Sequence, residues 1–399
     1  MQPLVEPGEE LTADEFTRYS RQVLLPGLGS VGQRRLKNAR VLVIGAGGLG
    51  SPVLTYLAAA GVGTISVIDD DVVEVSNLHR QVLHAGSALG TPKVDSAVRA
   101  LAELNPLVKV ESRQNRITRD NALEIIEGHD VVLDGTDNFA TRYLVGDACS
   151  IAGVPLVWGS VFRFDGQVSV FWSRPPQGHA PVTYRDLHPT PPPPGSVPSC
   201  AEGGVLGVTC AAIGSVMATE AIKLITGVGE PLLGRIMLFD AAGMTWQTIR
   251  VRPAPDAVPI SELAADYEAF CGIPAPDGSG DQASDASDVS VGELARRLER
   301  RGRGDDDFVL VDVREPEERL IASIPGAVGL PMSVLRTGDA GALLAQIAQG
   351  RPVVLHCKSG GRSAQVLEMA RDAGLDDVAH VPGGVLRWID EIDPTQPRY

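Results

Sequence analysis

Short hydrophobic runs alternate with stretches of helical periodicity along the first two thirds of the chain. The runs ARVLVIG, TISVID, DVVLD and PLVWGSV predict buried strands, and the stretches between them predict helices, among them 93–104, 121–127 and 140–151. Strands that alternate with helices predict a doubly wound α/β domain with a mostly parallel sheet. A long apolar stretch at 203–227 predicts a core or interface helix.

The pattern breaks late in the chain. Residues 273–288 are small and acidic and show no periodicity, which predicts a flexible linker. After it, the segments VGELARRLERRG, FVLVDVR and PVVLHC predict a helix and two strands of a second, smaller α/β domain. We therefore expect one domain at 11–272 and another at 289–399. A proline-rich stretch at 188–200 predicts an extended loop within the first.

Composition limits the partners and the cellular compartment that we expect for these domains. The formal net charge of −15 argues against a nucleic-acid surface, because phosphate binding needs clustered lysine and arginine. No apolar run long enough for a membrane span stands out. The acidic N-terminus lacks the basic segment and the apolar segment that follow one another in a signal peptide. The five cysteines show no paired spacing, which is typical of free thiols. We expect a cytoplasmic protein that binds neither membrane nor nucleic acid.

A glycine-rich turn follows the first predicted strand. Gly45, Gly47, Gly48 and Gly50 fit G-x-G-x-x-G, and Asp69 ends the next strand, about 20 residues beyond, where a ribose-binding acid belongs. Taken alone, this arrangement favours a nicotinamide-dependent dehydrogenase.

The segment after Asp69 changes that interpretation. It supplies four hydrogen-bond donors, Asn77, Arg80, Gln81 and Lys93. A nicotinamide ring needs a flat apolar slot, whereas arginine and lysine suit a triphosphate and its developing charge. A solvated charged loop is the plainer alternative.

Two carboxylates follow a later strand. Asp134 and Asp137 lie at the end of DVVLD, on the side of an open α/β sheet where ligands bind. Carboxylates beside phosphate-binding cations suit Mg²⁺. Four features are therefore expected together: the glycine-rich turn, the acid that would bind the ribose, the positively charged side chains, and the carboxylates at a strand end. This combination favours ATP over NAD as the ligand.

At these residues a family resemblance becomes specific. The segments GAGGLGSPVLTYLAAAGVGTISVIDDD, SNLHRQVLH, GTPK and LDGTDN resemble the E1-type adenylyltransferases of the MoeB and ThiF group, which activate ubiquitin-like sulfur carriers. The N-terminal RYSRQVLLPGLGSVGQRRL also matches, so the resemblance covers about 11–272. It implies that the turn at Gly48 and the side chains Asn77, Arg80 and Lys93 hold phosphates, that Asp69 holds the ribose, and that Asp137 holds Mg²⁺. It also implies a homodimer, since Arg21 would reach the neighbouring subunit's ATP site.

One family feature is missing. Bacterial MoeB enzymes bind structural zinc through two C-x-x-C pairs. The matching positions here read TYRD (Thr183 to Asp186) and EAFC (Glu268 to Cys271), which leaves one cysteine of four. We therefore expect no zinc.

The second domain carries the motif CKSGGR, from Cys357 to Arg362. Backbone N–H groups at a helix N-terminus stabilise a thiolate and bind an anion, which suits either a cysteine phosphatase or a sulfurtransferase. The loop is one residue shorter than the C-x5-R loop of cysteine phosphatases. The segments LVDVREPEE, IPGAVGLP and VPGGVLRW resemble the rhodanese sulfurtransferases, although ASIPGA replaces their usual G-H-I-P-G-A. The resemblance implies a persulfide on Cys357.

The fusion of both domains resembles adenylyltransferase/sulfurtransferases of the MoeZ type. It implies that ATP and Mg²⁺ activate the C-terminal glycine of a small ubiquitin-like carrier ending in Gly-Gly, and that the Cys357 persulfide attacks the acyl-adenylate. Thiosulfate or a cysteine desulfurase would supply the sulfur, and Cys200, at the position of the family's loop cysteine, would release the thiocarboxylate.

Two other functions remain open from sequence. The chain could be an NAD(P)-binding oxidoreductase fused to a redox rhodanese domain, or a scaffold that docks carriers without catalysis. Whether the carrier serves molybdopterin, cysteine or another thio-metabolite is also open.

Overall fold

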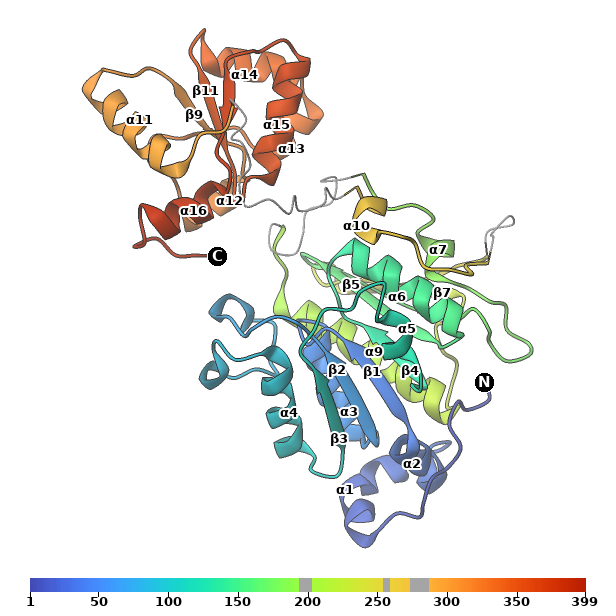
Figure 1. Ribbon diagram of the computed structural model, residues 1–399. Coiled ribbons are helices and arrows are strands. Elements are labelled where there is room, and N and C mark those ends of the chain that lie inside the picture. The colour runs from blue at the N-terminus through green and yellow to red at the C-terminus, as the bar shows by residue number, and fades with distance from the viewer. Residues whose placement is uncertain (194–202, 254–258, 273–286) are drawn as a thin grey trace. The chain divides into compact units, whose positions relative to one another are not determined.

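The computed structural model describes residues 1–193, 203–253, 259–272 and 287–399 (Figure 1). The chain divides into two compact units, Met1–Ala275 and Pro276–Tyr399. Nearly all of the expected linker at 273–288 falls outside the described residues, so the linker and the domain limits of 11–272 and 289–399 stay predictions.

The first unit is built on one sheet of eight strands in the order β3-β2-β1-β4-β5-β6-β7-β8. The pairs from β3 to β5 are parallel, and those from β5 to β8 are antiparallel. This arrangement confirms the predicted mostly parallel, doubly wound fold. The strands are β1 (Arg40–Ile44), β2 (Thr64–Ile68), β3 (Lys109–Arg113), β4 (Val131–Asp134), β5 (Leu156–Phe162), β6 (Asp165–Phe171), β7 (Arg235–Asp240) and β8 (Thr245–Arg250).

Helices cover both faces of this sheet. Val41 and Val43 of β1 belong to the core on one face, and Leu42 and Ile44 belong to the core on the other. Burial on both faces explains why the central strands read as continuous hydrophobic runs. The helices are α1 (Ala13–Val23), α2 (Gly29–Asn38), α3 (Gly50–Ala60), α4 (Lys93–Leu104), α5 (Ala122–Ile126), α6 (Phe139–Ala152), α7 (Tyr184–Leu187), α9 (Gly207–Thr226) and α10 (Tyr267–Phe270), with short 3₁₀ turns η1 (Val75–Asn77) and η2 (Gly86–Ala88).

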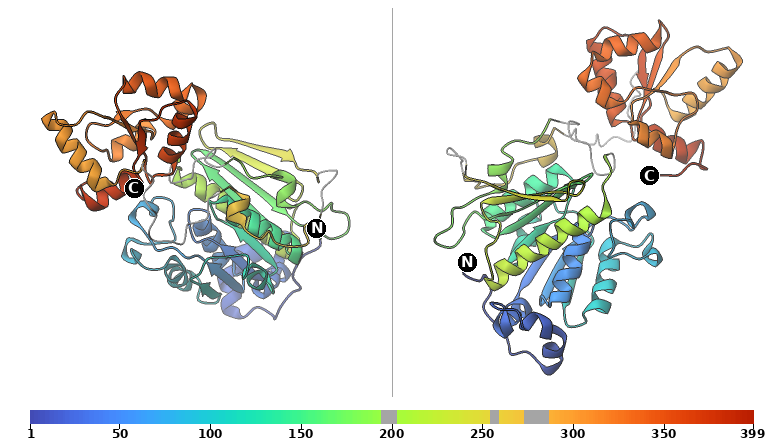
Figure 2. Two further views of the ribbon diagram at one scale, coloured as in Figure 1. Left: turned by 45° about the horizontal axis from the view of Figure 1, so that its top comes forward. Right: turned by 180° about the vertical axis from the view of Figure 1, so that it is seen from behind.

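Helix α9 is the long apolar helix expected at 203–227. Within the described residues it is the one helix whose length and composition would also suit a membrane span. It packs against α3 and against strands β5 and β6, and Figure 2 shows it crossing the sheet in the view from behind. Ile213, Met217 and Leu224 on its inner side are fully buried. The helix is therefore part of the core of the first unit.

The second unit is a smaller α/β domain, as predicted. Its four strands form a parallel sheet in the order β10-β9-β11-β12. The strands are β9 (Val309–Asp312), β10 (Val328–Gly329), β11 (Val353–His356) and β12 (Val378–His380). The helices are α11 (Val291–Arg303), α12 (Pro316–Ile321), α13 (Met332–Thr337), α14 (Ala340–Ala348), α15 (Gly361–Asp372) and α16 (Gly384–Glu391).

Candidate functional site

A cavity of about 430 Å³ opens at the carboxyl ends of β1, β2 and β4. All but one of the expected nucleotide-binding residues line it: Gly45, Gly47, Gly48, Asp69, Asn77, Arg80, Gln81, Lys93 and Asp137. The exception is Gly50, which begins α3 behind the turn. Clefts of this size suit small-molecule ligands, and the ends of parallel strands are where such sheets bind them.

The turn from β1 into α3 depends on its glycines at two positions. Gly45 has a φ of +91°, a left-handed conformation that favours glycine. A Cβ on Gly50 would lie 1.9 Å from the carbonyl oxygen of Gly45, so no larger residue fits there. The turn thus brings the N-terminus of α3 close to the cavity, where the positive end of the helix dipole can attract an anion.

Two side chains hold the peptide of Ala46 within this turn. Asp69 accepts a hydrogen bond from the Ala46 N–H at 2.7 Å and another from the Asp71 N–H at 2.9 Å. Burial raises the pKa of Asp69, although nearby Lys93 opposes that shift. His84 contacts the carbonyl oxygen of Ala46 at 2.9 Å, and burial lowers its pKa. No sequence motif pointed to His84, because its partner lies 38 residues away.

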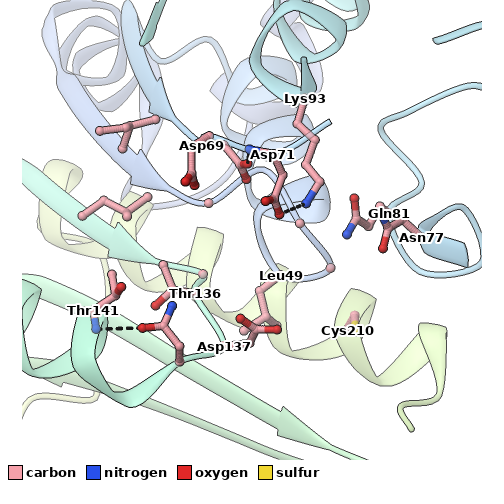
Figure 3. A pocket seen from close by; sticks show the side chains of 18 of the residues that line it. Leu49, Asp69, Asp71, Asn77, Gln81, Lys93, Thr136, Asp137, Thr141 and Cys210 are labelled. Carbon is pink, nitrogen blue, oxygen red and sulfur yellow. Dashed lines mark hydrogen bonds and ion pairs between the residues drawn. The ribbon is translucent and has the colours of Figure 1, made fainter. Parts of the chain in front are cut away.

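The predicted cations are held by defined partners on the η1 side of the cavity. Lys93, whose side chain is 6% exposed, pairs with Asp71 at 2.6 Å. Arg80 donates to the carbonyl oxygen of Ser76 at 3.0 Å and to Oδ1 of Asn77 at 3.1 Å. In Figure 3, Asn77, Gln81 and Lys93 lie across the opening from Thr136 and Asp137. These contacts fix the two cations at the edge of the cavity.

The loop after β4 presents Asp137, which is exposed in the cavity. Asp134 organises this loop by accepting hydrogen bonds from the Thr136 N–H and hydroxyl at 2.9 and 2.7 Å. Arg142 on α6 donates to the carbonyl oxygen of Thr136 from two nitrogens. Burial raises the pKa of Asp134, and the Arg142 charge acts in the opposite direction. Sequence reasoning gave Arg142 no role, because its contact depends on how α6 packs.

The structure does not test two of the predicted catalytic residues. Arg21 is exposed on α1 and is not among the residues lining the cavity. Cys200 falls in the stretch 194–202, outside the described residues. The role of Arg21 across a dimer and the role of Cys200 therefore stay predictions.

The segments that correspond to the family's zinc ligands meet around Asp147 of α6. Arg185 donates to both oxygens of Asp147 at 2.9 and 2.7 Å, and the Tyr267 hydroxyl donates to Asp147 at 2.7 Å. The Arg185 guanidinium also lies 4.6 Å from the centre of the Phe270 ring. Cys271 is buried, which raises its thiol pKa. These residues do not fit a zinc site, since an ion pair and ring contacts join the two segments.

In the second unit, Cys357 follows β11 and lies at the N-terminus of α15. The residue is 1% exposed, and the Gly360 N–H donates to its sulfur at 3.1 Å. The Ser363 hydroxyl lies 3.7 Å from the sulfur and 2.9 Å from the Gly360 carbonyl oxygen. Gly360 has a φ of +104°, and a Cβ there would lie 2.9 Å from the Gly383 nitrogen. The loop therefore encloses the sulfur and places the Gly360 N–H and the Ser363 hydroxyl beside it.

Arg362 lies beside this loop in a charged pair. Its guanidinium donates to both carboxylate oxygens of Glu318 on α12 at 2.7 and 2.8 Å. Glu318 is 6% exposed, so the pair is largely shielded from water. The structure thus ties the start of α15 to α12 through the last residue of the CKSGGR motif. The expected catalytic role of Arg362 stays a prediction.

Two families match the chain: the ThiF family at residues 19–259 and the rhodanese-like domain at residues 290–391. The probable adenylyltransferase/sulfurtransferase MoeZ of Mycobacterium tuberculosis is 51% identical over 397 residues, which cover 100% of this chain and 98% of that protein. The sulfur carrier protein adenylyltransferase of Thermus thermophilus is 51% identical over 267 residues, 66% of this chain and 98% of that protein.

Among solved structures, that of E. coli MccB with MccA-N7isoASN is similar to the first unit in fold. It gives a TM-score of 0.54 at 22% identity and covers 62% of this chain and 75% of that one.

Proposed function

Because the chain belongs to the ThiF family and is an adenylyltransferase and sulfurtransferase, we propose the following reaction. The first unit activates the C-terminal glycine of a small ubiquitin-like sulfur carrier with ATP. The second unit then supplies sulfur that converts the activated carboxylate to a thiocarboxylate. The relative from Thermus thermophilus is named for the first of these steps, and the MoeZ relative is named for both.

In the adenylation step, the carrier's terminal carboxylate attacks the α-phosphorus of ATP and pyrophosphate leaves. The turn Gly45–Gly50 and the N-terminus of α3 would bind the phosphates, together with Asn77, Arg80, Gln81 and Lys93. Asp69 would accept hydrogen bonds from the ribose. These groups lie on packed elements before substrate arrives, so little reorganisation is needed as charge moves toward pyrophosphate.

The residues at the cavity also fit Mg²⁺. Asp137 offers an exposed carboxylate, and the carboxylates of Asp69, Asp70 and Asp71 lie within 4.8 Å of one another nearby. Carboxylate oxygens together with substrate phosphates are the usual ligands of Mg²⁺. When bound, the ion would neutralise charge on the triphosphate, and we assign Asp137 as its protein ligand.

In the sulfur-transfer step, a persulfide on Cys357 attacks the activated carbonyl, and AMP leaves as the acyl disulfide forms. The thiolate of Cys200 then attacks the Cys357 sulfur, which releases the thiocarboxylate and leaves a disulfide that an external thiol must reduce. The Gly360 N–H and the Ser363 hydroxyl support the sulfur of Cys357 at the start of this step. We assign Arg362 to the sulfur donor, either thiosulfate or the persulfide of a cysteine desulfurase.

The family resemblance also supports a proposal for the assembly of the protein and its place in the cell. We propose that the protein works as a cytoplasmic homodimer in which Arg21 of each subunit completes the neighbouring ATP site. The pair formed by Arg185 and Asp147 would replace the family's zinc, and no zinc would be needed.

The observation that best supports this proposal is the meeting of the glycine turn, Arg80, Lys93 and Asp137 around one cavity. The test is reconstitution of the purified full chain with ATP, Mg²⁺, thiosulfate, a thiol reductant and a carrier ending in Gly-Gly. We expect intact mass spectrometry to show exchange of one carrier oxygen for sulfur, dependent on ATP and on thiosulfate. A carrier that gains no sulfur, with pyrophosphate release shown in parallel, would refute the sulfur-transfer step alone.

A further inference from the structure

A row of side chains leads away from the sulfur of Cys357. The hydroxyl oxygen of Ser363 lies 3.7 Å from that sulfur and 3.3 Å from Nδ1 of His380 on β12. On the other side of the ring, Nε2 of His380 lies 3.0 Å from Oδ1 of Asp288. Ser363 is fully buried, and the side chains of His380 and Asp288 are 13% and 22% exposed. The row therefore runs from an enclosed sulfur toward solvent.

Backbone pairing places the last member of this row. Asp288 forms a parallel β-bridge with His380. The His380 N–H donates to the carbonyl oxygen of Ser287 at 2.9 Å, and the Val289 N–H donates to that of His380 at 2.9 Å. The segment that opens the second unit thus extends the sheet beyond β12. This pairing fixes Asp288 opposite the histidine, which is a defined position and not a chance surface contact.

The chemistry of the carboxylate decides the tautomer of the histidine. An ionised carboxylate only accepts hydrogen bonds, so Nε2 of His380 carries the proton that faces Asp288. Nδ1 of the neutral ring is then an acceptor. The Ser363 hydroxyl lies 2.9 Å from the Gly360 carbonyl oxygen, which also accepts from the Ala364 N–H, and 3.3 Å from Nδ1, so its one proton can turn from the carbonyl to the ring. The Ser363 oxygen is left free to accept from the Cys357 thiol. All members of the row are satisfied in this state.

We propose that Ser363, His380 and Asp288 form a proton relay that takes the thiol proton of Cys357 and holds it while the sulfur reacts. The proposal rests on the proposed function of Cys357 and adds the group that activates it. His380 and Asp288 act through Ser363 and are positioning residues. In nucleophilic catalysis a general base takes the proton of the nucleophile, and a nearby histidine often has this role.

The proton and electrons balance in each step. The thiol proton moves to the Ser363 oxygen as the serine's own proton moves to Nδ1 of His380, which leaves a thiolate and an imidazolium paired with Asp288. The thiolate attacks the outer sulfur of thiosulfate, the sulfur–sulfur bond of the donor breaks, and sulfite leaves with its electron pair. In the charged state the hydrogen bonds reverse: the imidazolium donates to Ser363, and Ser363 donates to the sulfur.

Other charged groups around His380 come from the elements packed against β12. Burial lowers the pKa of His356 on β11 to about 4, so this ring is neutral at neutral pH. Arg371 on α15 donates to the Ser287 hydroxyl, next to Asp288. The remaining charged residues of these elements are Lys358 in the loop, Arg362, Glu368 and Asp372 on α15, and Asp376 and Asp377 before β12. Asp288 is the carboxylate that contacts the ring.

The test measures the rate at which iodoacetamide alkylates Cys357 in the full chain, from pH 5 to 9, with peptide mapping to separate it from the other cysteines. We expect His380→Gln and Ser363→Ala each to lower the rate at pH 7 by about tenfold and to move its rise to higher pH. Asp288→Asn should have a smaller effect in the same direction. Ser287→Ala, beside Asp288 but outside the relay, is the matched control and should react like wild type.

Melting temperatures measured on the same samples separate this role from a structural one. Unchanged pH profiles in His380→Gln and Ser363→Ala, with folding intact, would overturn the relay. If a variant fails to fold, Asp288→Asn carries the test, because it keeps the size of the side chain and removes its charge.

Thiocyanate formation from thiosulfate and cyanide tests the underlying function separately. If Cys357→Ser still forms thiocyanate, the proposed function of Cys357 is wrong, whatever the alkylation profiles show.

Discussion

The replacement Arg80→Ala tests the nucleotide site most directly. Within the described residues, Arg80 makes its hydrogen bonds to neutral oxygens, the Ser76 carbonyl and Oδ1 of Asn77. Lys93, by contrast, pairs with the carboxylate of Asp71. Arg80 therefore brings an uncompensated positive charge to the cavity, held in place by its two tethers.

The size of the effect follows from that geometry. Loss of one preorganised donor to a developing negative charge typically costs about 3 kcal/mol, or roughly 10²-fold in rate. Arg80→Lys keeps the charge but loses the planar fork that makes both tethers, so we expect a loss of about tenfold. Arg99→Ala, which removes an exposed arginine of α4 that does not line the cavity, should exchange at the wild-type rate.

The assay is carrier-dependent ATP–pyrophosphate exchange, run beside thiosulfate sulfurtransferase activity on the same protein. We expect exchange to fall in Arg80→Ala while the sulfurtransferase activity of the second unit stays at the wild-type level. Exchange at the wild-type rate would refute the assignment of Arg80 to the phosphates. A fall in both activities would point to misfolding in place of a lost phosphate contact.

Three further outcomes are expected. If Arg21 acts across a dimer, mixing Arg21→Ala subunits with Asp137→Ala subunits should restore part of the exchange activity, and no recovery in proven mixed dimers would place Arg21 elsewhere. Cys357→Ser should form acyl-adenylate but no thiocarboxylate, whereas Cys200→Ser should leave the carrier joined to Cys357 as an acyl disulfide. Non-reducing intact mass distinguishes these two, and thiocarboxylate from Cys357→Ser would put the sulfur on another residue. Asp147→Ala should lower stability by about 2 kcal/mol, because it strands a partly buried arginine. Calorimetry checks this loss, and a wild-type melting temperature that falls on chelation would instead indicate a structural metal.

Local sequence determined most of the fold and identified many of the residues that line the candidate site. The hydrophobic runs and their glycine boundaries set the order of strands and helices, because periodicity and turn chemistry act over a few neighbouring residues. The parallel sheet then brought Gly45, Asp69 and Asp137 to one edge, since strands of that topology end on the same side. Nine residues of the cavity were accessible to sequence reasoning for this reason.

The two segments that lack the cysteine pairs show a different limit of sequence analysis. Sequence revealed that three of four expected cysteines are missing, but it did not reveal what joins Thr183–Asp186 to Glu268–Cys271. The pair of Arg185 and Asp147 spans 38 residues and depends on how α6 packs against α7 and α10. A pattern of buried positions states which side of a helix faces inward, not which residue it meets there.

At Cys357, too, sequence predicted the local motif, and tertiary structure decided which distant residues meet it. The motif from Cys357 to Arg362 is contiguous, so sequence alone predicted an enclosed sulfur at the start of a helix. Tertiary structure decided that Arg362 pairs with Glu318, 44 residues away, and that Ser363 meets His380, 17 residues away. Hydrogen bonds between distant side chains exist only once the sheet and its helices have packed, because packing sets their distances and excludes competing water. Sequence therefore identified Cys357, and the packed fold determined which side chains surround its sulfur.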